Sequence, residues 1–236
     1  MSLPLPTIAA IETSTELASV ALLCGDRLVS RESSGAQTHS MTVLALLQEL
    51  LREQNITLGQ CDALAFGSGP GSFTGVRTAC GLAQGLAFGA NLPVVPVVTL
   101  LAMADAARHQ AAGDNIIAVL DARVGEVYWA QYRFDGQWKT VSEPRLSAPE
   151  QVIAQDASCA AGNGLAAYAD RFAELQLIPR LPELMPHARQ IALLGRQFFQ
   201  QGQGVHAREA QPLYLRNKVA LTTAERTAAQ STGVVS

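Results

Sequence analysis

The stretch IAAIE at residues 8–12 returns in the second half of the chain as IAVLD at residues 117–121. Both are apolar runs typical of buried strands, and both end in an acidic residue followed by a short turn. Each turn leads to a further strand and then to a hairpin signal, Gly25-Asp26 in the first copy and Asp135-Gly136 in the second. This repeated order indicates an internal duplication. Chance similarity between two Ile/Ala-rich strands is the alternative, because the identity is low.

Strands and helices alternate after the first copy. We predict strands over residues 18–24, 27–32, 63–67 and 94–98, and helices over residues 39–52, 73–88 and 100–110. The second half is less regular, with a strand over 127–134, a strand-to-helix turn at 162–164 and a short amphipathic helix over 191–199. This order predicts an α/β protein in which mixed sheets are flanked by helices.

The chain has 236 residues, enough for two small cores. With the duplication, this predicts an N-terminal lobe over residues 1–102 and a smaller C-terminal lobe over residues 103–220. Residues 221–236 are polar and aperiodic, so we expect a disordered tail there. The N-terminus is no signal peptide and no apolar run is long enough to span a membrane, so we expect a cytoplasmic protein that binds no membrane.

Charged residues make up only 16% of the chain, against roughly 25% in ordinary soluble domains. A chain with so few charges either buries more surface than usual or covers part of it with a partner. The net charge is −3. A protein that grips nucleic acid by itself normally has a basic face, so we expect any contact with RNA to run through another subunit.

The stretch GPGSFTG at residues 69–75 lies between a predicted strand and a predicted helix. Ser72 is placed to cap the helix, and amides at such a helix start can hold an anion. We therefore predict anion or nucleotide contacts at Gly71, Ser72, Thr74 and Arg77. The motif is not a P-loop, because no Gly-Lys-Ser/Thr follows. A tight turn that uses glycine for its backbone freedom is the alternative.

Catalytic chemistry has no clear signature in the sequence. The four histidines are not spaced as a helical metal pair, and Ser14, Ser68 and Ser72 have no histidine nearby in sequence. We therefore assign no catalytic residue and no metal ligand. Glu12 and Asp121 end the two equivalent strands, where a capping or turn role is the simplest interpretation.

The two predicted helices in the first lobe have unusual outer faces. Opposite the core stripe of the first helix lie Met41, Ala45, Gln48 and Arg52, and opposite that of the second lie Thr78, Gly81, Gly85 and Gly89. A glycine inside a helix costs about 1 kcal/mol relative to alanine. Close packing of a second backbone would offset that cost. Another part of this chain or a partner protein is the candidate, and we predict that these eight residues bind a partner.

Four motifs resemble the TsaB (YeaZ) family and occur in the same order along the chain. They are IETST at 11–15, GPGSFTGVR at 69–77, DARVGEVY at 121–128 and PLYLR at 212–216. The resemblance implies a duplicated actin-like (ribonuclease H-like, ASKHA) fold with two lobes. It also implies a non-catalytic subunit that supports its catalytic paralogue TsaD and works with the ATPase TsaE. That complex transfers threonylcarbamoyl to the adenosine next to the tRNA anticodon.

The resemblance further implies a homodimer when the chain is alone, and tRNA binding only through the complex. Residues 99–103 lack the metal motif of the catalytic paralogue, so ATP and metal are expected on the partner subunits and no cofactor is expected to bind strongly here. Glu12 and Asp121 then become relics of an ATPase site, since Thr13 replaces the glycine beside the first acid. A small-molecule kinase on the same fold, or a peptidase acting on the partner, remain alternatives.

Overall fold

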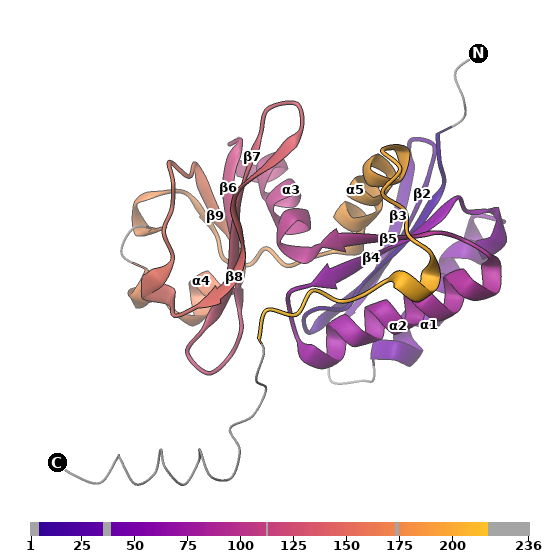
Figure 1. The fold of residues 1–236 in the computed structure, drawn as a ribbon, viewed down its shortest axis with the longest axis horizontal. Coiled ribbons are helices and arrows are strands. Elements are labelled where there is room, and N and C mark those ends of the chain that lie inside the picture. Colours follow the sequence, from indigo (N-terminus) through magenta and orange to yellow (C-terminus); the bar gives the residue numbers. More distant parts are fainter. Residues whose placement is uncertain (1–4, 35–38, 112, 173–174, 217–236) are drawn as a thin grey trace, which may run out of the picture.

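Two five-stranded sheets of the same topology form the two lobes of the molecule (Figure 1). The computed structural model describes residues 5–34, 39–111, 113–172 and 175–216. The first sheet has the order β3-β2-β1-β4-β5, with β1 Ile8–Glu12, β2 Leu17–Cys24, β3 Arg27–Ser34, β4 Ala63–Gly69 and β5 Val94–Val98. The second has the order β8-β7-β6-β9-β10, with β6 Asn115–Asp121, β7 Val127–Phe134, β8 Trp138–Ser147, β9 Cys159–Ala161 and β10 Arg180–Leu181.

The pairing within the sheets confirms the duplication. In the first sheet β1 runs antiparallel to β2 and parallel to β4, and in the second β6 runs antiparallel to β7 and parallel to β9. The predicted equivalence of residues 8–12 and 117–121 is therefore an equivalence of the two central strands. The fold is the expected duplicated actin-like one, with mixed sheets flanked by helices.

Helices of very unequal length cover the two sheets. The α-helices are α1 His39–Glu53, α2 Phe73–Ala90, α3 Thr99–Ala111, α4 Gly164–Ala167 and α5 Ala188–Gln200. Short 3-10 helices are η1 Leu58–Gln60, η2 Pro149–Gln151, η3 Ala169–Arg171, η4 Leu175–Leu177 and η5 Ala207–Glu209. Helices α1 and α2 lie on the same face of the first sheet (Figure 1) and bury small and branched side chains there, among them Val43, Leu47, Leu50, Ala79 and Ala83.

The last helix of each copy packs on the sheet of the other copy. Helix α3 follows β5 yet packs against β6, β7 and β9, whereas α5 follows the second sheet yet packs against β1, β2 and β4. A single core cluster joins these layers. A Cβ added to Gly195 of α5 would lie 2.5 Å from the Cβ of Ala65 in β4, so α5 is seated directly on the first sheet.

The division at residue 102 stays a prediction, although the packing of α5 does not follow it. Residues 188–200, assigned above to the second lobe, complete the core of the first, and most of α3 completes the core of the second. The physical reason is that helical periodicity shows which face of a helix is apolar, but not which sheet buries that face. The helix predicted over 191–199 also begins earlier, because the His187 ring accepts a hydrogen bond from the Arg189 amide and caps it.

Residues 205–216, which we call the strap, run from the first lobe to the second (Figure 1). Val205 pairs with Val94, and the carbonyl oxygen of Ala210 accepts a hydrogen bond of 2.9 Å from Gln84 in α2. At the far end Arg216 forms an ion pair of 2.5 Å with Glu126. The strap therefore ties α2 to the second lobe. The tail predicted over 221–236 lies outside the described residues.

Candidate functional site

The glycine turn between β4 and α2 is shaped by its contact with the turn after β1. A Cβ added to Gly75 would lie 1.9 Å from the Thr13 carbonyl oxygen, and one added to Gly71 would lie 2.5 Å from that of Ser14. The Ser72 amide donates to the same Ser14 oxygen at 2.7 Å. Glycine is therefore required here by backbone contact, which explains the motif without a ligand. The Ser72 hydroxyl accepts a hydrogen bond from the Gly75 amide, which confirms it as the N-cap of α2.

A cleft of about 390 Å³ lies between the two lobes. Its lining includes Gly71 and Ser72 from the predicted anion site, whereas Thr74 and Arg77 lie outside it. Asn163 and Tyr128 line the second-lobe side. The turn at 162–164 and the motif at 121–128 that contain them are visible in the sequence, but neither residue was assigned to a site, because neither pattern shows that it faces a cleft. Binding of an anion or nucleotide here stays a prediction.

Glu12 lies sealed beneath the cleft and does not line it. Its side chain is fully buried, and its carboxylate accepts hydrogen bonds from the Ser14 amide at 2.6 Å and the Thr99 hydroxyl at 3.1 Å. A Cβ at Gly67 would lie 1.9 Å from this carboxylate, so β4 closes over it. Burial raises the pKa of Glu12, although the hydrogen bonds from Ser14 and Thr99 partly lower it. The carboxyl group therefore ties β1 to the start of α3 and cannot reach a substrate in the cleft.

Asp121 ends the corresponding strand β6 in the second lobe and does line the cleft. Its carboxylate accepts hydrogen bonds from the Arg123 amide at 2.8 Å and the Tyr168 hydroxyl at 2.9 Å. The Arg123 guanidinium lies 3.2 Å away. These contacts hold the hairpin between β6 and β7 and use much of the carboxylate's capacity to accept hydrogen bonds. The two predicted relic acids thus end corresponding strands but lie on different faces of their sheets. Glu12 shares the face of Ile8 and Ala10, which α5 covers, whereas Asp121 shares the α4 face of Ile117 and Val119.

The outer faces of α1 and α2 expose the residues predicted to bind a partner. Met41, Ala45, Gln48, Arg52, Gly81, Gly85 and Gly89 are exposed, and Thr78 is half-buried. A Cβ added to Gly81, Gly85 or Gly89 would meet no atom within 4 Å. Within the part of the chain that the structure describes, nothing packs on this glycine face, so the alternative of an internal contact is not supported there.

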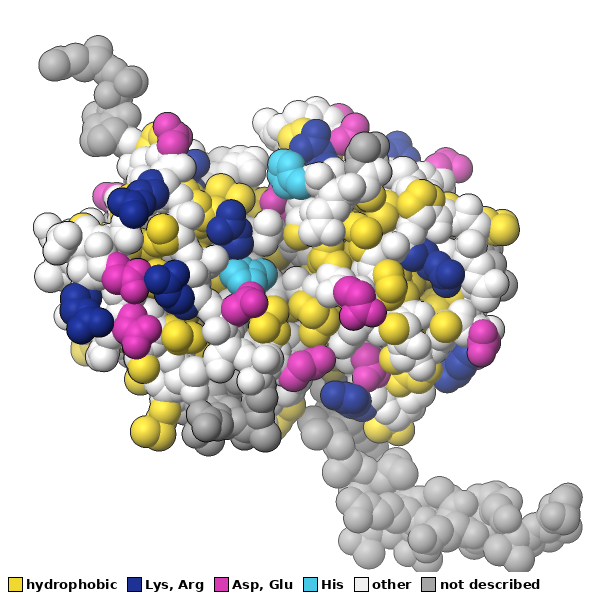
Figure 2. All heavy atoms as spheres, turned by 180° about the vertical axis from the view of Figure 1, so that it is seen from behind, with side chains coloured by type: hydrophobic (Ala, Val, Ile, Leu, Met, Phe, Trp, Pro, Cys, Tyr) yellow, Lys and Arg dark blue, Asp and Glu magenta, His cyan; other side chains and the backbone are white. Residues whose placement is uncertain are grey.

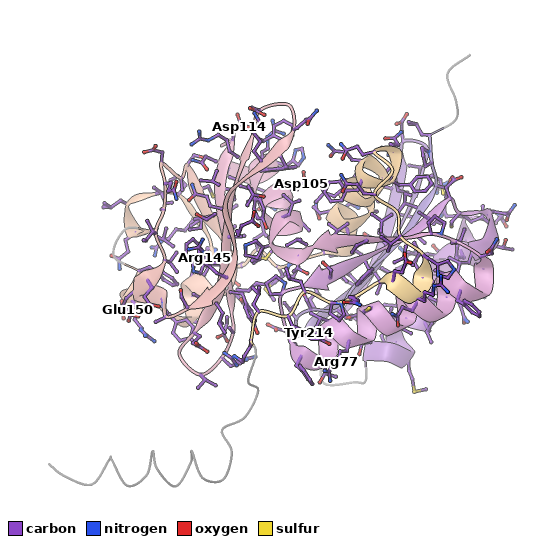
Figure 3. The ribbon with its side chains drawn as sticks, in the orientation of Figure 1. Arg77, Asp105, Asp114, Arg145, Glu150 and Tyr214 are labelled. Carbon is purple, nitrogen blue, oxygen red and sulfur yellow. The ribbon has the colours of Figure 1, made fainter. Side chains whose placement is uncertain are left out.

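Arg77 lies on the exposed side of α2 between two aromatic rings. Its guanidinium carbon is 3.5 Å from the centre of the Phe73 ring, and its Nε donates to the Tyr214 hydroxyl at 2.7 Å. Figure 3 places Arg77 and Tyr214 together where the strap passes the start of α2. These residues are 137 positions apart in sequence, so no local pattern could have joined them.

Candidate metal ligands do not gather in the described ranges. No group of three or more His, Cys, Asp or Glu side chains there is arranged to hold a metal ion. Residues 99–103 form the buried first turns of α3 and carry no ligand side chain. No described helix is long and apolar enough to cross a bilayer.

The fold and site define a duplicated actin-like protein in which the open surface lies on the outer helices of the first lobe. Residues 33–224 match the family described as "TsaD: tRNA N6-adenosine threonylcarbamoyltransferase". The "tRNA threonylcarbamoyladenosine biosynthesis protein TsaB" of Haemophilus influenzae is 40% identical over 225 residues, which cover 90% of this chain and 94% of the relative. The protein of the same name from Escherichia coli is 38% identical over 90% of this chain and 96% of its own.

The solved structure of YeaZ from Pseudomonas aeruginosa superposes with a TM-score of 0.83 at 37% identity, covering 89% of this chain and all of that one. The chain belongs to the TsaB (YeaZ) family.

Proposed function

We propose that this chain is a non-catalytic partner subunit in the synthesis of threonylcarbamoyladenosine in tRNA. It would hold the catalytic paralogue TsaD through the outer faces of α1 and α2, and would pair with a second copy through the same faces when alone. The family membership supports the pathway, since the Haemophilus and Escherichia relatives carry the name of tRNA threonylcarbamoyladenosine biosynthesis proteins.

One observation carries the proposal of a docking role: the open glycine face of α2. Glycines at 81 and 85 cost about 2 kcal/mol of helix stability together, and no described atom packs on them to offset that cost. The side chains of Met41 and Phe88, both 76% exposed, lie on the same helix pair. Bare backbone beside exposed large apolar side chains is typical of a surface that a protein partner covers.

We propose that the chain is not catalytic because of the way its candidate acids are buried and bonded. Glu12 is buried beneath β4 and holds α3, so it is not free to activate water or bind a metal in the cleft. ATP and metal would then be bound by TsaE and TsaD. On the face that Figure 2 shows, basic and acidic side chains are interspersed and form no basic band. With a net charge of −3, the chain is expected to meet tRNA only through the complex.

Two alternatives would give positive signals in simple assays. A small-molecule kinase on this fold would use Asp121 in the cleft and would consume ATP in the isolated chain. A peptidase would cleave TsaD. The geometry does not favour the kinase, because Asp121 is already bonded to Arg123 and Tyr168.

The test is a Gly85→Leu substitution, with Gly59→Leu as the matched control. Both glycines are exposed, and a Cβ at either meets no atom within 4 Å. We expect Gly85→Leu to leave the fold intact or stabilise it by up to about 1 kcal/mol, since leucine favours helix. It should nevertheless block capture of purified TsaD and dimerisation, measured by pull-down and sedimentation beside a thermal melt. Capture of TsaD by Gly85→Leu as well as by Gly59→Leu would place the interface elsewhere.

A further inference from the structure

Phe73, Arg77 and Tyr214 form a rigid charged platform on the surface, which we call the Arg77 platform. The guanidinium carbon of Arg77 lies 3.5 Å from the centre of the Phe73 ring and 5.4 Å from that of Tyr214. The two ring centres are 6.1 Å apart. Phe73 is 42% exposed and Tyr214 45%, so both rings keep a free surface. An arginine held in this way has lost most of its side-chain freedom before any partner arrives.

Two of the three other described arginines that lie over aromatic rings have a carboxylate partner, and the third, Arg145, has none among the described residues. Arg108 pairs with Asp114 at 2.7 Å, and Arg171 pairs with Glu150. Arg77 has no carboxylate partner among the described residues. Its Nε is used by the Tyr214 hydroxyl, which leaves the two terminal nitrogens of the guanidinium without a described acceptor. Those two nitrogens are the fork that binds a carboxylate with two parallel hydrogen bonds.

The platform is continuous with the glycine face of α2. Phe73, Arg77, Gly81, Gly85 and Gly89 follow one another at intervals of four residues, which is one ridge on a helix surface. Two large side chains therefore stand at one end of this ridge and three glycines form the rest. A partner helix that enters the shallow part over the glycines reaches Arg77 at its end.

The charge at this end of α2 lacks a local counterpart. The helix carries no acidic residue in its first turn, and a helix start has a partial positive charge of its own. Arg77 adds a full positive charge nearby. No described carboxylate forms an ion pair with Arg77, so a partner protein can supply one.

We propose that Arg77, positioned by Phe73 and Tyr214, binds a carboxylate side chain of the protein that packs on the glycine face of α2. This inference rests on the proposed function, which supplies that protein as TsaD. It adds a binding residue outside the eight predicted above, and it assigns the strap a role, because the strap brings Tyr214 to the interface.

The experiment measures the affinity of purified TsaD for the full-length chain by calorimetry at low and high salt. Arg77→Ala should weaken binding about 10- to 100-fold, as loss of an arginine hot spot does. Arg77→Lys should rescue little of it, because an ammonium group lacks the planar fork. Tyr214→Phe keeps the ring and removes only the bond to Nε, so its loss should be smaller. A carboxylate contact also predicts that Arg77→Ala reduces the salt dependence of binding.

Arg145→Ala is the matched control. Arg145 is also an arginine near an aromatic ring, 5.2 Å from the centre of Trp129, but it lies on β8 of the other lobe (Figure 3). The affinity of the Arg145→Ala variant for TsaD should stay within about twofold of the wild type. A thermal melt of each variant separates loss of binding from loss of fold.

The outcomes distinguish this inference from the proposed function. If Gly85→Leu blocks TsaD and Arg77→Ala does not, the proposed function stands and the Arg77 inference is overturned. If neither variant weakens binding, or the wild type does not bind TsaD, both are overturned. If Arg77→Ala weakens capture of tRNA by the complex but leaves TsaD affinity unchanged, Arg77 binds a phosphate of the RNA. The proposal that it binds a carboxylate of TsaD is then overturned.

Discussion

The two sheets share one strand order but differ in the layer that covers their outer faces. The first carries the long helices α1 and α2, whereas the equivalent face of the second carries the four-residue α4 and short 3-10 helices. Strand order is held by backbone hydrogen bonds, which any apolar sequence can satisfy, so it survives divergence of the two copies. The covering layer depends on side chains and has diverged. The proposed partner surface exists only on the copy that kept two long helices.

The acids that end β1 and β6 also differ between the two copies, because they lie on different faces of their sheets. Glu12 is fully buried and bonded to the start of α3, while Asp121 reaches the cleft and holds a hairpin. Two acids that end corresponding strands can therefore differ in access to the cleft, because successive strand positions face opposite sides of a sheet.

Two helix glycines provide the largest expected contrast, because one faces inward and the other outward. Gly195→Leu should destabilise the protein by about 3 kcal/mol or prevent folding, since even its Cβ would lie 2.5 Å from Ala65. Gly85→Leu, in open space, should not destabilise it. Urea denaturation of both variants measures the difference. Equal stabilities would contradict the packing of α5 on the first sheet.

Alanine substitutions of the two acids that end β1 and β6 should differ less in their effect on stability. Glu12→Ala is expected to cost about 2–3 kcal/mol, because it leaves the Ser14 amide and the Thr99 hydroxyl buried without their acceptor. Asp121→Ala should cost about 1 kcal/mol, because water can enter from the cleft. Chemical denaturation checks both, and assembly with TsaD is measured alongside. An activity loss of the complex with unchanged stability and assembly would instead show a functioning acid.

Glu12→Gln tests the same carboxyl group through pH. Because burial raises the pKa of Glu12 above its usual value, the folded state holds a proton that the unfolded state has released. Stability from this group is present at low pH and is lost as pH rises from the unfolded pKa through the folded one. Relative to the wild type, Glu12→Gln should therefore gain stability as the pH rises from about 5 to about 8. A difference that is constant with pH would contradict the raised pKa.

The cap of α5 should respond to pH in the opposite direction. The His187 ring accepts from the Arg189 amide and lies 3.0 Å from Glu32, and burial lowers its pKa although Glu32 raises it in part. Its contribution to stability is present above the unfolded pKa of about 6.5 and is lost as pH falls through the folded value. His187→Asn keeps a capping acceptor that does not titrate, so its stability should fall less on acidification. Denaturation at neutral and acidic pH measures both slopes.

The smallest expected effect is at Tyr132 in β7. Its hydroxyl is buried and has no hydrogen-bond partner in the described part of the chain. Tyr132→Phe should leave stability unchanged or raise it by up to about 1 kcal/mol, because it removes an unsatisfied polar group. Tyr168→Phe, which loses the bond to Asp121, is the control and should lower stability. A clear loss in Tyr132→Phe would reveal a partner for that hydroxyl.

The strand pattern and the duplication were predictable from sequence because both are written in local apolar periodicity and turn residues. The exposed face of α2 was predictable for the same reason. The burial of Glu12 was not, since it depends on Gly67 and Thr99 approaching from other elements. The Arg77 platform was missed because Tyr214 reaches it along the strap. The exchange of α3 and α5 was missed because the apolar face of a helix does not show which sheet buries it.

That exchange determines when each lobe is completed as the chain leaves the ribosome. Strands β1 to β5 have been made by Val98, yet the face of the first sheet that α5 covers stays bare until residues 188–200 emerge. At bacterial and eukaryotic rates of synthesis this interval is roughly 5–20 s. During it, apolar residues such as Ile8, Leu23 and Ala65 face water or a chaperone. The nascent first lobe is thus an incomplete folding unit whose missing layer is translated only after every strand of the second sheet.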